Sequence, residues 1–113
     1  MSRDDVYLLD ILVAARLALQ YVSGKTCERF LGDVQLQDAV IRRLAVIGEA
    51  ARRVSEATRL AHPSLPWHEM IGMRNIVVHE YDDVDLNVVW DAVARDLKPL
   101  VNALEKVVPP QES

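Results

Sequence analysis

Apolar residues recur every three or four positions along most of the chain, which is the spacing of one face of an α-helix. In the first such stretch the apolar stripe consists of Val6, Leu9, Leu12, Val13 and Leu17. This pattern predicts a helix over about residues 3–22. Ser2, followed three residues later by Asp5, forms a shortened capping box that can start it.

The next segments predict one helical turn and then a second long helix. Residues 26–31 predict the turn, packed down by Phe30 and Leu31, and Asp33 can cap the helix that follows. That helix should span about residues 34–61, with an apolar stripe of Leu36, Val40, Ile41, Leu44, Ile47, Ala51 and Val54. Gly48 in this stripe would let another helix come close.

The polar side of the second long helix carries half of the arginines of the chain. Glu49 precedes Arg53 by four residues and Glu56 precedes Arg59 by three, and both spacings predict ion pairs on the helix surface. We therefore interpret this side as a solvated face. A phosphate-binding strip is the less favoured alternative, although five arginines between residues 42 and 59 form the only basic concentration in the chain.

The rest of the chain, from about residue 62, predicts two more helices. Pro63 ends the preceding helix, Pro66 suits the first turn of a helix from Trp67 to about residue 78, and aspartates at 82–85 favour the start of a last helix over 86–107. Pro99 lies inside that last pattern and predicts a kink. The whole is an all-α, up-and-down bundle of four main helices with an additional short helix. One domain should cover residues 1–108, followed by a short disordered tail at 109–113.

Composition limits the possible functions. At 113 residues the chain forms one domain, and a hydrophobic share of 50% suggests apolar surface that would enter a partner interface. The net charge of −4 excludes a generic cationic nucleic-acid binder, so any RNA contact would be local. A single cysteine, Cys27, fits a reducing cytosol. We find neither a signal pattern nor a membrane span, so we expect a cytoplasmic protein.

The segment Arg74–Tyr81 gathers most of the candidate chemistry. Arg74 and His79 are five residues apart, or about 140° around an ideal helix, so they do not share a face, whereas Asn75 and His79 do. Arg74 could wrap around its helix, or the helix could loosen after residues 77–78. In a symmetric dimer, both copies of the segment could instead line one cleft. The spacing leaves all three routes open.

These side chains suit a metal-free cleavage of RNA. His79 could take the proton of a ribose 2′-hydroxyl, and Arg74 could stabilise the charge that develops on the phosphoryl oxygens. Asn75 could orient the imidazole or bind a phosphate oxygen, and Tyr81 could add a hydroxyl contact. The alternative is structural, because an arginine near a helix end commonly pairs with carboxylates such as Glu80. We expect no cofactor, and the three histidines lack metal-ligand spacing.

The cysteine and the two tryptophans are weaker candidates for a functional site. Nothing near Cys27 suggests an activating site. Trp67 and Trp90 occupy helical positions that favour the core or an interface over a base-stacking platform.

The chain resembles the HepT-like family, a branch of the HEPN superfamily, over almost its whole length. The similar stretches are Y-L-L-D-I-L from residue 7, Q-D-A-V-I-R-R-L from 37, I-G-E-A at 47–50 and P-W-H-E-M-I-G-M-R-N-I-V-V-H-E-Y at 66–81. The last matches the family motif R-x-x-x-x-H-x-Y at Arg74, His79 and Tyr81, with the polar Asn75 after the arginine.

The resemblance implies a HEPN-like homodimer that acts as the toxin of a type II/VII-like toxin–antitoxin pair. It implies a metal-independent endoribonuclease in which Arg74, Asn75 and His79 of both protomers share a cleft. It further implies a partner, a small nucleotidyltransferase antitoxin that uses ATP to adenylylate Tyr81 and silence the toxin. The alternative is a non-catalytic dimeric module that binds the nucleotidyltransferase or a nucleotide.

Overall fold

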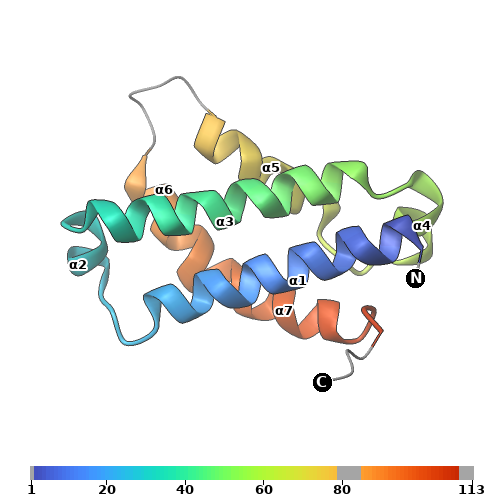
Figure 1. Cartoon of the computed structure of the whole chain (residues 1–113), viewed down its shortest axis with the longest axis horizontal. Helices are drawn as coiled ribbons and strands as arrows, with labels where there is room; N and C mark the ends of the chain where they lie inside the picture. Colours follow the sequence, from blue (N-terminus) through green and yellow to red (C-terminus); the bar gives the residue numbers. More distant parts are fainter. Residues whose placement is uncertain (1, 79–84, 110–113) are drawn as a thin grey trace.

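The computed structural model of the chain describes residues 2–78 and 85–109, apart from the side chains of residues 76–78. Within these ranges every regular element is helical, which confirms the all-α prediction. Two long helices, α1 (Arg3–Val22) and α3 (Val34–Arg53), run side by side across the front of the molecule (Figure 1). Helix α5 (Trp67–Val78) packs against α3, and α7 (Leu97–Glu105) packs against α1.

The start of α1 is fixed by the capping box that the sequence predicted. The hydroxyl of Ser2 accepts from the backbone N–H of Asp5 at 3.0 Å, and the carboxylate of Asp5 accepts from the N–H of Ser2 at 3.2 Å. Two orphan N–H groups of the first turn are thereby satisfied. The predicted helix over 3–22 is confirmed.

The short helix α2 (Cys27–Leu31) confirms the turn expected at 26–31, and its hydroxyl cap is Thr26. Phe30 is fully buried, with its ring 5.5 Å from that of Trp90. Leu31, however, is 41% exposed, so the expectation that it packs with Phe30 was wrong. Asp33 then caps α3 by accepting from the N–H of Leu36, as predicted.

The second long helix is shorter than the sequence predicted. Instead of continuing to residue 61, α3 ends at Arg53, Val54 is extended, and a separate helix α4 (Glu56–Ala61) begins after Ser55. Ser55 caps the new helix by accepting from the N–H of Thr58 at 3.3 Å, and a residue of α1 reinforces this turn. The carboxylate of Asp4 accepts from the N–H of Ser55 at 3.1 Å and from the hydroxyls of Ser55 and Thr58, each at 2.5 Å. These contacts satisfy the start of α4, and the hydrogen bonds of Ser55 and Thr58 hold the pKa of Asp4 below its ordinary value of 3.8.

The two surface ion pairs expected on this helix are also wrong. Glu49 pairs with Arg74 of α5 rather than with Arg53. Arg59 turns back and donates to backbone carbonyls at the end of α3, to Arg52 at 2.8 Å, Val54 at 3.1 Å and Ala51 at 3.4 Å. It therefore serves as a side-chain cap for the carbonyls at the end of α3, of which only that of Ala51 also accepts from a backbone N–H, that of Val54.

The C-terminal run is interrupted near the predicted position. Asp85 caps α6 (Leu86–Asp91), and a π-helical turn η1 (Ala92–Asp96) separates α6 from α7. Pro99 lies in the first turn of α7, where its missing N–H could not continue a regular α-helix from Arg95. The chain changes direction between α6 and α7 (Figure 1), so the expected disruption takes the form of a π-turn just before the proline. Residues 82–84 and the tail at 110–113 lie outside the described residues.

The core is formed mainly by buried side chains of α1, α3, α5 and α7. Among the described residues it is entirely apolar. Its largest fully buried side chains are Phe30, Leu8, Ile11, Leu44, Ile47, Met70, Leu97 and Leu104. Trp67 and Trp90 pack against this core as the sequence predicted, and the indole of Trp67 donates to the carbonyl of His62 at 3.0 Å.

Candidate functional site

Helix α5 presents the first residues of the candidate site at the edge of the molecule. Met70 and Met73 on its inner side are 0% and 3% exposed, so they hold α5 against the core. Arg74 follows directly, with a side chain 35% exposed. Asn75 is exposed. The two polar groups lie close to the end of α5, about one turn before Val78.

The position of Arg74 is set by a close approach between α3 and α5. A Cβ atom added to Gly48 would lie 2.6 Å from both the Cβ and the backbone nitrogen of Arg74, and 3.0 Å from its Cα. Any other residue at position 48 would force the two helices apart. The expectation that Gly48 admits a neighbouring helix is confirmed, and the residue it admits is the candidate phosphate-binding cation.

Glu49, the next residue of α3, forms an ion pair with Arg74 through its Oε1 atom and the Nε of the guanidinium. Both side chains are more than a third exposed, at 40% and 35%. Within the described part of the chain Arg74 has no further ion pair or side-chain hydrogen bond. A guanidinium has five N–H donors, so an arginine anchored by one of them keeps others for a phosphate.

His79 and Tyr81 lie outside the described residues. The structure therefore describes Arg74 and Asn75 of the predicted site and brings Arg74 together with Glu49. The three ways in which Arg74 and His79 could meet therefore stay open: Arg74 could wrap around its helix, the helix could loosen after residues 77–78, or two copies of the chain could share a cleft.

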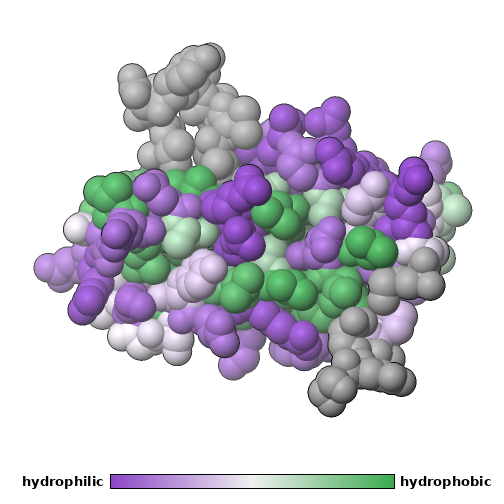
Figure 2. Space-filling view, viewed as in Figure 1, coloured by the Kyte–Doolittle hydropathy of each residue, from purple (hydrophilic) through white to green (hydrophobic). Residues whose placement is uncertain are grey.

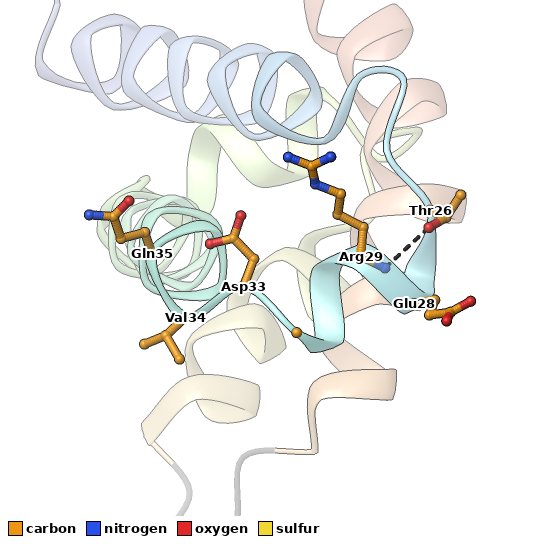
Figure 3. A pocket seen from close by; sticks show the side chains of 7 residues that line it. Thr26, Glu28, Arg29, Asp33, Val34 and Gln35 are labelled. Carbon is orange, nitrogen blue, oxygen red and sulfur yellow. Dashed lines mark hydrogen bonds between the residues drawn. The ribbon is translucent and has the colours of Figure 1, made fainter.

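One hollow of the surface lies away from Arg74 and has a structural explanation. A shallow hollow at the junction of α2 and α3 is lined by Thr26, Glu28, Arg29, Gly32, Asp33, Val34 and Gln35 (Figure 3). The hydroxyl of Thr26 and the carboxylate of Asp33 are engaged there as helix caps. Cys27 is half-buried beside it, with its sulfur 3.9 Å from Asn87 Oδ1. Neither feature adds a reactive group.

Two properties of the described residues bear on the kind of site. No helix in the described ranges is long and apolar enough to cross a membrane. The same residues contain no cluster of three or more histidine, cysteine or acidic side chains placed to hold a metal ion.

Comparison with known proteins decides the family. A family model described as "Ribonuclease HepT-like" matches residues 11–107. This chain belongs to the HepT-like family. It is 39% identical over 101 residues to "Probable ribonuclease HepT" of Thermococcus cleftensis, covering 89% of this chain and 92% of the relative. It is 35% identical over 109 residues to "Putative RNase MJ1380" of Methanocaldococcus jannaschii, covering 95% and 100%. No solved structure matches significantly.

The residues that hold Arg74 lie in a stretch that resembles the HepT-like family. Two residues of the site, Gly48 and Glu49, were not among the predicted site residues. Both belong to the stretch I-G-E-A at 47–50, one of those that carry the resemblance to the HepT-like family. The glycine already indicated a close contact between helices, but the sequence did not show that Arg74 is the residue it admits or that Glu49 pairs with it.

Proposed function

We propose that this chain is the toxin of a toxin–antitoxin pair and acts as a metal-independent endoribonuclease. The observation that carries the proposal is the environment of Arg74 in a HepT-like chain. Its backbone is fixed against Gly48, its guanidinium is anchored by Glu49, and the group remains more than a third exposed beside the exposed Asn75. A cation held in this way is preorganised for a phosphate.

In the proposed reaction a ribose 2′-oxygen attacks the adjacent phosphorus while His79 accepts the 2′-hydroxyl proton. The bond from phosphorus to the 5′-oxygen breaks, and the leaving oxygen takes up a proton. The products are a 2′,3′-cyclic phosphate and a 5′-hydroxyl end. Arg74 stabilises the negative charge on the phosphoryl oxygens during the transfer, and Asn75 orients the imidazole or the phosphate.

The proposal includes two copies of the chain around one cleft, because Arg74 and His79 do not share a face of an ideal helix. It also includes a cytoplasmic nucleotidyltransferase antitoxin that transfers adenylate from ATP to the hydroxyl of Tyr81, releasing pyrophosphate. An anionic adduct two residues from His79 would repel the RNA backbone and silence the toxin.

The test is expression of the chain without antitoxin, with growth and RNA integrity as readouts. The wild-type protein should slow growth and degrade RNA, and Arg74→Ala and His79→Ala should do neither while folding normally. Cleavage that is equal in the wild type and in His79→Ala would remove His79 from the mechanism. For the modification, wild type but not Tyr81→Phe should gain the mass of adenylate when incubated with antitoxin and ATP.

A second candidate function is a non-catalytic dimeric module that binds the nucleotidyltransferase or a nucleotide. The acidic net charge of −4 favours it, since an RNA enzyme gains from a positive surface. It predicts intact RNA at every expression level and impaired binding of the partner by Arg74→Ala. RNA loss with the wild type, absent with His79→Ala, would reject it.

A further inference from the structure

The outer side of α3 carries a line of small and charged residues that are exposed or half-buried. Seven residues advance an α-helix by nearly two full turns, so Asp38, Ala45 and Arg52 lie almost along one line. Asp38 and Arg52 are exposed, and Ala45 is half-buried. Arg42 and Glu49 lie beside this line on the side away from the core. We call these five residues the α3 stripe.

The charges of the α3 stripe are largely unsatisfied within one copy of the chain. The side chains of Asp38, Arg42 and Arg52 have no ion pair or hydrogen bond with any other described residue. Glu49 is engaged by Arg74 but remains 40% exposed. Both signs of charge alternate along the stripe, whereas a surface for RNA would be of one sign. The pattern therefore suits a protein surface with matching charges.

The order of these charges is self-complementary about Ala45. Asp38 lies seven residues before Ala45 and Arg52 lies seven residues after it. If a second copy of α3 packs antiparallel with the two-fold axis at Ala45, Asp38 of each copy meets Arg52 of the other. Arg42 then lies close to Glu49 of the other copy. A parallel pairing in register would instead oppose Asp38 with Asp38 and Arg52 with Arg52.

We propose that the α3 stripe is the interface between two copies of this chain, packed antiparallel about Ala45. The small side chain of Ala45 allows the two helices to approach closely at the axis. Figure 2 shows apolar residues gathered along α1 beside the more hydrophilic surface of α3. Val6 and Val13, exposed 42% and 44%, belong to α1, the helix that packs beside α3, and a stable interface needs such apolar area.

This arrangement also sets where the candidate site lies relative to the two-fold axis. Gly48, against which the backbone of Arg74 lies, is three residues from Ala45, or about 4.5 Å along the helix. The two copies of Arg74 would therefore flank the two-fold axis. The inference rests on the proposed function, which calls for two protomers around one cleft, and it names the surface that joins them.

The experiment is a charge exchange followed by sedimentation, carried out without RNA or antitoxin. The wild type should be a dimer. Asp38→Arg and Arg52→Asp should each weaken the dimer by about tenfold or more, because each creates two pairs of like charges per dimer. The double variant should recover the wild-type association. A mixture of the two single variants should also form dimers, since each supplies the charge that the other lacks.

Matched controls carry the same charge changes on other elements. Glu28→Arg on α2 and Arg95→Asp on η1 alter exposed residues away from the α3 stripe and should leave the mass unchanged. A monomeric wild type, single variants that dimerise like these controls, or a double variant no better than the singles would each overturn the interface. If the charge exchange behaves as expected but the wild type leaves RNA intact, the interface stands and the ribonuclease proposal fails.

Discussion

Gly48 and Arg74 meet through their backbones, and no side chain of any size fits between them. The candidate phosphate-binding cation is therefore positioned by the packing of α3 on α5 and not by its side-chain contacts alone. Because Arg74 lies at the contact between α3 and α5, substitutions at the residues that form this contact should alter its position even if they never touch RNA.

Gly48→Ala should separate α3 from α5, since its Cβ would lie 2.6 Å from two atoms of Arg74. We expect a loss of about 1–3 kcal/mol in the free energy of unfolding, the usual cost of overpacking. Urea denaturation measures it. Gly72→Ala is the control. A Cβ at Gly72 meets nothing within 4 Å, and an alanine inside a helix should stabilise by about 0.4–1 kcal/mol. Equal stabilities for the two variants would contradict the close approach.

Glu49→Ala should disturb catalysis more than stability. The ion pair with Arg74 is more than a third exposed, so its loss should cost less than about 1 kcal/mol of unfolding free energy. Misplacing the guanidinium should lower kcat for RNA cleavage by about tenfold or more. Glu49→Gln keeps an oxygen that accepts from the Nε of Arg74 and should retain more activity. Full activity in Glu49→Ala would show that Arg74 needs no anchor.

Arg59→Ala should destabilise the end of α3. The guanidinium donates to three backbone carbonyls there; those of Arg52 and Val54 would lose this donor, while that of Ala51 would keep the N–H of Val54. We expect a decrease of about 1–2 kcal/mol in the free energy of unfolding, measured by thermal or urea denaturation. Arg53→Ala is a suitable control, because Arg53 is exposed and its side chain bonds to no other described residue. If both variants unfold alike, the capping role of Arg59 is refuted.

The contribution of Asp4 to stability should depend on pH in a defined direction. Hydrogen bonds from Ser55 and Thr58 lower the pKa of this carboxyl from 3.8 in the folded protein. The stability it adds is therefore fully present above pH 3.8 and is lost as the pH falls through the lower, folded value.

The measurement compares wild type with Asp4→Asn by urea denaturation across this range. The wild type should be more stable near neutral pH, and the difference should shrink only below pH 3.8. Asp10→Asn, which changes an exposed carboxylate on the same helix, should show no such convergence. A difference that persists unchanged in strong acid would exclude ionised Asp4 as the source.

Local signals in the sequence predicted local structure well. The capping box at Ser2, the cap at Asp33 and the helix from Trp67 depend on residues within a turn of each other, and all three are confirmed. The break at Ser55 was missed although Ser55 itself caps α4, and the contact that reinforces it, with Asp4, comes from far away in the chain.

In the candidate site, too, a contact between residues far apart in the chain was not predicted from the sequence. Spacing within one helix assigned Glu49 to Arg53, whereas the structure pairs it with Arg74 on another helix. Ion pairs between helices leave no periodic trace, so the sequence could supply the arginine but not its anchor. The role of His79 as general base still rests on imidazole chemistry and on the resemblance, and the modification of Tyr81 rests on the resemblance alone.

The contact of Asp4 with the turn before α4 has a consequence for the order of folding. Its hydrogen-bond partners lie 51 and 54 residues further along the chain. During synthesis the first turn of α1 leaves the ribosome early, yet the carboxylate of Asp4 has no such donors until the turn between α3 and α4 has emerged. The Asp4 contact closes the loop that contains α1 and α3, so it can form only after both of these helices have been synthesised.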